Sequence, residues 1–228
     1  MIHFHIVTLF PDSIEPYLQS SILGRARKGI APKGKKSGKP LLKISYYDPK
    51  KYTRDTYGRV DKRPYGGGPG MVLEPEAILR AVDAAKKSAS RRSKGKPEII
   101  FFGTDGKVFD EADAKKLSGK KDIIMICGRY EGIDARVQKI LKATVVSVGP
   151  YVLTGGELPA ATLVDAISRF VPGVLGKAES LEASRVSSPE VYTRPEVLVW
   201  KKKKYPVPPV LLTGNHAAID AWRTEKRK

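Results

Sequence analysis

Two glycine-rich segments, CGRYEGIDARV at Cys127–Val137 and VVSVGPYVLTGGELPAA at Val145–Ala161, decide how this chain folds. Each joins an apolar or β-branched run to a glycine-rich turn that carries one acidic residue, Glu131 in the first and Glu157 in the second. Glycine lets the backbone turn sharply and approach a ligand closely, and turns at strand ends are where α/β sheets bind ligands. The two segments therefore predict a single pocket lined largely by main chain.

Neither segment is one of the common nucleotide-binding motifs. A dinucleotide loop needs three spaced glycines between a strand and a helix, and a P-loop needs Gly-Lys-Ser or Gly-Lys-Thr after four free residues. Neither spacing occurs in this chain. We therefore expect the glycines to serve a different ligand.

Composition limits the class of protein. A chain of 228 residues can bury roughly 70% of its unfolded surface, which suits one sizeable core and a small second domain. The single cysteine, Cys127, excludes an internal disulfide and favours a reducing, cytoplasmic location. Together with only three histidines it predicts no metal-ligand cluster. No signal peptide or membrane-spanning run is recognised, so no membrane partner is expected.

The net charge of +18 points to a polyanionic partner. Lysine and arginine outnumber aspartate and glutamate by 42 to 24, and they cluster at 25–43, 86–96, 201–204 and 226–228. Such clusters suit the phosphates of RNA or DNA. The alternative is that these charges only solvate surface loops. Composition alone does not say which nucleic acid is bound.

Strand and helix patterns alternate along the first three quarters of the chain. We expect strands at 2–8, 41–47, 98–102, 122–127 and 144–148, and helices at 12–26, 74–87, 110–117, 133–140 and 158–170. This alternation predicts an α/β domain with a mostly parallel sheet over residues 1–175. A basic loop at 28–39 and a polar stretch at 48–69 interrupt it.

The character of the chain changes after Pro172. Residues 176–209 are rich in serine, proline and lysine, and only 215–223 has a clear helical pattern, with Asn215 as its N-cap. We therefore predict an interdomain linker at 176–188 and a small helical domain at 189–228. The chain ends soon after Trp222 and Arg223, so this domain is expected to be short.

Six motifs together resemble one known family. They are RPYGGGPGMV at Arg63–Val72, the two segments quoted above, RFVPGVLG at Arg169–Gly176, YTRPEV at Tyr192–Val197 and LLTGNHAAIDAWR at Leu211–Arg223. In this order, and over nearly the whole chain, they resemble the bacterial tRNA (guanine-N1)-methyltransferases that modify guanine 37 beside the anticodon. Six matches in order are far more specific than a single glycine loop.

The resemblance implies a SPOUT-class fold with a deep trefoil knot, one of the rare exceptions to the rule against threaded chains. It implies a homodimer in which the knot of one subunit and the C-terminal domain of the other form each active site. It also implies S-adenosylmethionine as methyl donor. By match, the donor is held by Gly128, Tyr130, Glu131, Gly132, Ser147, Val148, Gly149, Tyr151, Leu153, Gly155, Gly156 and Pro159.

The same resemblance implies tRNA as the partner, with guanine at position 37. By match, the residues that contact RNA are Arg63, Tyr65, Gly66, Gly67, Arg194, Asn215, His216 and Arg223. The family also depends on magnesium, although this sequence offers carboxylates but no dedicated ligand set.

The chemistry requires a base and a cation. Guanine N1 carries a proton, and its loss leaves negative charge on O6, so methyl transfer needs a general base at N1 and a positive or donor group at O6. Arg169 matches the family arginine near the guanine. Its alternative role is a charge that complements the C-terminal dipole of a helix.

The sequence departs from the family where the base is expected. The family base is an aspartate in an acidic linker, and an ungapped count from Arg169 reaches Ser184 in a linker that is shorter than usual. We assign the base to Glu182, with Glu179 as the competing carboxylate. Two further departures are Pro150, where an acidic residue is common, and FFGTDGKVF at Phe101–Phe109, which replaces the usual turn beside the donor.

Several individual residues have a structural alternative. Gly155 and Gly156 also suit a tight strand-to-helix turn, and Tyr130 and Tyr151 suit a core. Glu131 also suits a charge at a helix N-terminus. For the whole protein, the alternatives are an RNA-binding relative that has lost catalysis and a knotted methyltransferase that acts on another RNA base.

Overall fold

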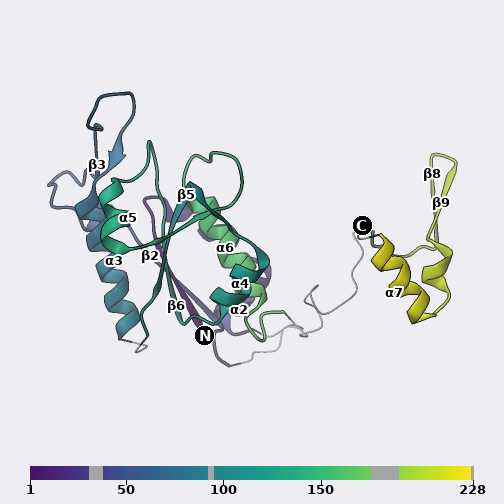
Figure 1. Cartoon of the computed structure of the whole chain (residues 1–228). Helices are drawn as coiled ribbons and strands as arrows, with labels where there is room; N and C mark the ends of the chain where they lie inside the picture. Colours follow the sequence, from purple (N-terminus) through teal and green to yellow (C-terminus); the bar gives the residue numbers. More distant parts are fainter. Residues whose placement is uncertain (31–37, 92–94, 176–189, 227–228) are drawn as a thin grey trace. The chain divides into compact units, whose positions relative to one another are not determined.

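The computed structural model describes residues 1–30, 38–91, 95–175 and 190–226. The chain divides into two compact units, Met1–Gly176 and Lys177–Lys228. Each unit is described by itself below and is coloured by sequence in Figure 1.

The first unit is built on a five-stranded sheet. Its strands are β1 (Ile2–Val7), β2 (Leu42–Tyr47), β5 (Glu98–Val108), β6 (Asp122–Ile126) and β7 (Thr144–Ser147). They lie in the order β2-β1-β6-β5-β7, and every neighbouring pair is parallel. Strands β1 and β6 are buried on both faces, which explains their nearly continuous apolar sequences. The predicted α/β fold with a mostly parallel sheet is confirmed.

Helices cover both faces of this sheet (Figure 1). Three helices, α2 (Ser21–Lys28), α4 (Glu111–Ser118) and α6 (Glu157–Arg169), pack on the face that carries Phe4 and Met125. On the other face α3 (Pro75–Ser90) and α5 (Ala135–Leu141) pack against Val7 and Ile124. Because neighbouring strand residues point to opposite faces, one apolar strand supplies both cores.

One predicted helix is wrong in its extent. The sequence predicts a single helix at 12–26, but the structure has a 3-10 turn η1 (Pro11–Ser13), a four-residue helix α1 (Glu15–Leu18) and then α2. Pro16 lies in the first turn of α1, where its missing N–H costs nothing, and Ser21, the first residue of α2, has a φ of 45°. The apolar spacing was genuine, but the backbone breaks between the two pieces.

Strand β5 is longer than predicted. It was expected to end at Phe102 but continues to Val108 after a register shift between Phe102 and Lys107. A Cβ atom on Gly106 would lie 2.7 Å from the carbonyl carbon of Val145, so glycine is required where the two strands approach. Gly103 and Thr104 lie within this register shift and border a cleft at the carboxyl edge of the sheet.

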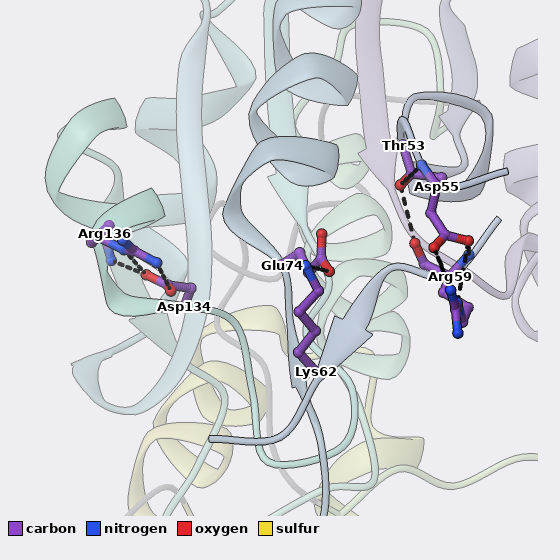
Figure 2. A network of polar contacts seen from close by, with 7 residues as sticks. All are labelled: Thr53, Asp55, Arg59, Lys62, Glu74, Asp134 and Arg136. Atoms are coloured by element: carbon purple, nitrogen blue, oxygen red, sulfur yellow. Dashed lines mark hydrogen bonds and ion pairs between the residues drawn. The ribbon is translucent and has the colours of Figure 1, made fainter. Parts of the chain in front are cut away.

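The polar stretch between β2 and α3 forms an arm that projects from the sheet. We define the arm as residues 48–74; it contains the 3-10 turn η2 (Pro49–Lys51) and the short strands β3 (Asp61–Lys62) and β4 (Val72–Leu73). Ion pairs within it join Arg59 to Asp55 at 2.9 Å and Lys62 to Glu74 at 2.7 Å (Figure 2). Val60 and Leu73 anchor the arm in the core on the α3 side, and these polar contacts help to order its exposed part.

The second unit contains more than the predicted helix. Strands β8 (Val197–Trp200) and β9 (Lys203–Pro206) form an antiparallel hairpin, followed by the 3-10 turn η5 (Pro209–Leu212) and helix α7 (His216–Glu225). The predicted N-cap is confirmed, because the Asn215 side chain accepts a hydrogen bond from the Ala218 N–H at 3.2 Å. The hairpin is an addition to the predicted helical domain.

None of the helices in the described part of the chain combines the length and apolar character needed to cross a bilayer.

Candidate active site

A cleft opens at the carboxyl edge of the sheet, where β5, β6 and β7 end. Its volume is about 190 Å³. The residues predicted to hold a donor all line it: Gly128, Tyr130, Glu131, Gly132, Ser147, Val148, Gly149, Tyr151, Leu153, Gly155, Gly156 and Pro159. We call 127–133 the first pocket loop and 148–156 the second. The sequence pattern thus located the cleft, although it missed Arg129, Val152 and Thr154 in its lining.

The two pocket loops touch each other backbone to backbone. The Gly156 N–H donates to the Gly128 carbonyl oxygen at 3.0 Å, and Arg129 forms an isolated bridge with Gly155. A Cβ atom on Gly156 would lie 2.6 Å from Cα of Cys127, a distance that no side chain tolerates. Neither Gly155 nor Gly156 has a positive φ, so the glycine pair is needed for close approach and not for an unusual turn.

A buried ion pair fastens the same junction. Arg129 Nε lies 2.9 Å from Glu157 Oε2, and Thr8 Oγ1 donates to Glu157 Oε1 at 2.7 Å. The Glu157 side chain is only 2% exposed. Glu157 is also the first residue of α6, where the helix dipole favours a carboxylate. The Arg129 guanidinium also lies 4.7 Å from the centre of the Phe10 ring. Glu157 is therefore a structural carboxylate, committed to holding the loops.

The second pocket loop is folded back on itself. The buried Ser147 hydroxyl accepts from the Gly149 N–H at 3.2 Å, and Tyr151 OH donates to the Val148 carbonyl at 3.0 Å. The Tyr151 ring lies so close to Gly149 that an added Cβ would be 2.3 Å from it, and Gly149 has a φ of 156°. Tyr151 is 54% exposed and so is not the core aromatic of the alternative interpretation.

The arm reaches the cleft at Glu131. The Glu131 N–H donates to the Met71 carbonyl at 3.0 Å, and the Leu73 N–H donates to the Gly132 carbonyl at 3.0 Å. A Cβ on Gly70 would lie 2.4 Å from Glu131 Oε1, so the glycine loop of the arm passes directly over this carboxylate. The loop also carries the predicted RNA contacts Arg63, Tyr65, Gly66 and Gly67, and Tyr65 is 99% exposed.

Arg169 does not line the cleft. It ends α6, ten residues beyond Pro159 and therefore roughly 15 Å along the helix axis. There it borders a separate hollow together with Tyr17 and Asp165, whose side chains are joined by a hydrogen bond from the tyrosine hydroxyl. One chain thus presents the donor cleft and the predicted guanine contact at different places.

The predicted base lies outside the described residues, as do Glu179, Ser184 and the whole predicted linker at 176–188. In the second unit Arg194 borders a hollow with Tyr192 and Leu211. There Arg223 pairs with Asp220 at 3.1 Å. His216 begins α7 beside the Asn215 cap.

One polar cluster was not anticipated. We expected the histidines to form no cluster, but His3 and His5 meet Asp122 in the core, with candidate ligand atoms within 4.8 Å of one another. His5 Nε2 lies 3.1 Å from Asp122 Oδ1, and its Nδ1 lies 2.9 Å from the hydroxyl of Tyr47. These contacts link β1 to β2 and β6. The arrangement depends on strand register, which spacing along the sequence does not reveal.

Comparison with known proteins agrees with this site. The family model described as tRNA (Guanine-1)-methyltransferase TrmD matches residues 2–228. The chain belongs to this family. The resemblance of the six motifs is therefore confirmed, and the protein is a methyltransferase.

Curated relatives extend over nearly the same length. A tRNA (guanine-N(1)-)-methyltransferase of Clostridioides difficile is 40% identical over 228 residues, covering 98% of this chain and 91% of the relative. Its namesake in Haemophilus ducreyi is 42% identical over 223 residues, covering 96% and 83%. That of Pseudoalteromonas atlantica is 40% identical over 227 residues, covering 98% and 79%.

The geometry of the cleft suits a methyltransferase. Its walls are backbone from two loops, with the exposed carboxylate Glu131 at the edge and apolar side chains around it. The buried Cys127 behind the cleft is no nucleophile, because burial and the nearby Glu157 carboxylate raise the pKa of its thiol well above the usual range. The site can therefore bind and position a ligand, while the methyl group has to come from that ligand.

Proposed function

We propose that this protein transfers a methyl group from S-adenosylmethionine to N1 of guanine 37 in tRNA. One observation carries the proposal: all twelve residues matched to the donor site line a single cleft, at the place where the two pocket loops are joined by their backbones. Family membership supports tRNA and guanine N1 as the target. The position in the tRNA and the donor are our proposal.

The lining of the cleft suits the chemistry of the donor. The close approach at Gly156 and Gly149 leaves room only for backbone, so the walls offer N–H and C=O groups to the polar edge of a nucleoside. Glu131 supplies a carboxylate at the rim that complements a cationic sulfonium. When bound there, S-adenosylmethionine supplies an electrophilic methyl group.

The chain must supply the groups that act on guanine. We assign the removal of the N1 proton to Glu182 and the stabilisation of negative charge at O6 to Arg169. A positioned base contributes about 10² to 10⁴ in rate. Because Arg169 lies far along α6 from the donor cleft, we propose that these residues serve the cleft of a second subunit.

A homodimer also accounts for exposed apolar side chains around the cleft. Val152 is 86% exposed, Leu158 59% and Phe10 41%, and all three flank the pocket loops or the start of α6. Covering such side chains in a subunit interface removes apolar surface from water. We propose that this surface is the dimer contact.

Magnesium does not fit the described part of the cleft. Among the described residues that line it, the one carboxylate is that of Glu131, and the neighbouring buried Glu157 carboxylate is engaged by Arg129 and Thr8. Magnesium prefers an octahedral set of oxygen ligands. We therefore derive no step through the ion.

The test is transfer of a labelled methyl group to unmodified tRNA with guanines at positions 36 and 37. We expect label in that tRNA and none in a matched tRNA with adenine at 37. Label in both transcripts would overturn the position and favour a methyltransferase of another base. Binding of donor and tRNA without transfer would favour the relative that has lost catalysis.

A further inference from the structure

The tip of the hairpin in the second unit combines exposed aromatic rings with unpaired positive charge. The hairpin tip is defined as residues 200–205, WKKKKY. Trp200 is 62% exposed and Tyr205 is 51% exposed. Among the described residues, none of the four lysines between them is paired with a carboxylate, unlike Lys62 and Lys107 in the first unit.

The strand register places both rings on one face. Trp200 stands opposite Lys203, and Leu198 stands opposite Tyr205. Directly opposed residues of an antiparallel pair share a face, so Trp200 and Tyr205 are diagonal neighbours with Lys203 beside them. All eight residues of β8 and β9 are exposed, so this unit leaves that face uncovered.

The turn of the hairpin is made by two lysines in an unfavourable conformation. Lys201 has a φ of 48° and Lys202 a φ of 65°, the positive pair that a two-residue type I′ turn requires. Asn-Gly is the sequence that adopts this turn most readily, because a Cβ atom crowds the backbone at positive φ. Lysine at these two positions is therefore opposed both by backbone strain and by repulsion from the neighbouring lysines. This cost indicates that the positive charge serves to bind a partner.

We propose that the hairpin tip grips a single-stranded loop of the substrate tRNA, with Trp200 and Tyr205 stacked on an unpaired base and Lys201–Lys204 on the flanking phosphates. Unpaired RNA bases stack on aromatic side chains, and lysine neutralises phosphate without reading sequence. Charge complementarity favours RNA, since the hairpin tip carries four positive charges. The inference rests on the proposed function for the identity of the RNA, but not for the contact itself.

The sharpest variant replaces the turn by its preferred sequence. Lys201→Asn with Lys202→Gly should leave the hairpin at least as stable, because it relieves both positive-φ residues. It should nevertheless weaken tRNA binding on the order of tenfold at 0.15 M salt. The slope of log affinity against log salt should fall in magnitude by about 1.4 to 1.8, because two phosphate contacts are lost. The matched control is Lys115→Gln with Lys116→Gln on α4, which removes the same charge elsewhere and should change neither quantity.

The stacking is tested at Trp200. Trp200→Ala should weaken tRNA binding by about 5- to 100-fold, and Trp200→Phe should recover most of it. In a Trp222→Phe protein, Trp200 is the remaining tryptophan, and its fluorescence should be quenched when tRNA is added. Unchanged emission together with full affinity of Trp200→Ala would overturn the stacking.

The same full-length variants separate this inference from the proposed function. If the parent methylates tRNA while the turn variant binds tRNA with parent affinity and salt slope, the hairpin contact is wrong and the function stands. If the parent transfers no methyl group but the turn variant still loses tRNA affinity, the contact stands and the function fails. Should the variants lose binding to vesicles of phosphatidylserine and keep full affinity for tRNA, the hairpin faces a membrane surface and the inference is overturned.

Discussion

Arg129 Nε lies 2.9 Å from Glu157 Oε2 across the line where the two pocket loops meet. Neither atom has a well-directed hydrogen bond, so the contact is an ion pair held by charge. It joins the loop after β6 to the first turn of α6, and Thr8 extends it to the end of β1. Three segments that are distant in sequence thus share one buried carboxylate.

The first prediction concerns this carboxylate. Glu157→Gln keeps the size of the side chain but leaves Arg129 without its counter-charge, and we expect a loss of about 2–4 kcal/mol in the free energy of unfolding. Affinity for S-adenosylmethionine should fall as the loops separate. Chemical denaturation and calorimetry measure the two effects.

Its matched control is Glu131→Gln, which removes the exposed carboxylate of the same cleft. That variant should bind the donor less tightly while its stability changes by less than about 0.5 kcal/mol. If Glu157→Gln were as stable as Glu131→Gln and the parent, the ion pair would not hold the two loops together.

The second prediction tests the close approach at the glycine pair. Gly156→Ala would place a methyl group 2.6 Å from Cα of Cys127, so the loops must move apart. We expect a loss of about 1–3 kcal/mol in stability and weaker donor binding. Gly119→Ala is the control, because its new methyl group would lie at an ordinary 3.5 Å from the Lys116 carbonyl oxygen. If both variants bound the donor with the same affinity, the contact between the two pocket loops would play no part in donor binding.

The sequence predicted the cleft because its signals are local. The apolar runs of β6 and β7 and the N-cap Asn215 act within a few residues of their place in the chain, and the glycine-rich turns directly follow those runs, although Gly156 itself serves a contact with the other loop. Periodicity also gave the five parallel strands, four of them nearly within their bounds, and all but one of the longer helices of the first unit.

Features that depend on tertiary contacts were missed. The Arg129–Glu157 pair forms only when the loop after β6 meets α6, and the cluster of His3, His5 and Asp122 forms only when β1 and β6 align. The β8–β9 hairpin was not predicted because its turn is made by two lysines and not by Asn-Gly, the sequence that signals such a turn. The extension of β5 to Val108 was not predicted because its residues are polar and pair with β7 only after a bulge.

The third prediction is a pH dependence in the arm. Hydrogen bonds from the Arg59 side chain, and then from its backbone N–H, lower the pKa of Asp55 from 3.8 to about 2. Because the folded pKa is depressed, the stabilisation of the arm is present above pH 3.8 and is lost as the pH falls towards 2. NMR titration of the Asp55 carboxyl group should give a midpoint near 2 in the parent.

Replacing the partner provides the control for that titration. In Arg59→Gln the midpoint should rise towards 3.8, and exchange of the arm amides with solvent should speed up at neutral pH. A parent midpoint already near 3.8 would show that the ion pair drawn in Figure 2 does not hold in solution.

The last prediction concerns the base. If Glu182 accepts the N1 proton, Glu182→Gln should keep donor and tRNA binding but lose about 10² to 10⁴ in single-turnover methyl transfer, and its rate should lose the acidic limb of the pH profile. Ser184→Ala should be nearly silent. Glu179→Gln separates the competing assignment, because only one carboxylate can lie at hydrogen-bond distance from N1 in a given pose. Parent rates for both glutamine variants would exclude the linker glutamates and move the base to another residue of the active site, including one from a second subunit.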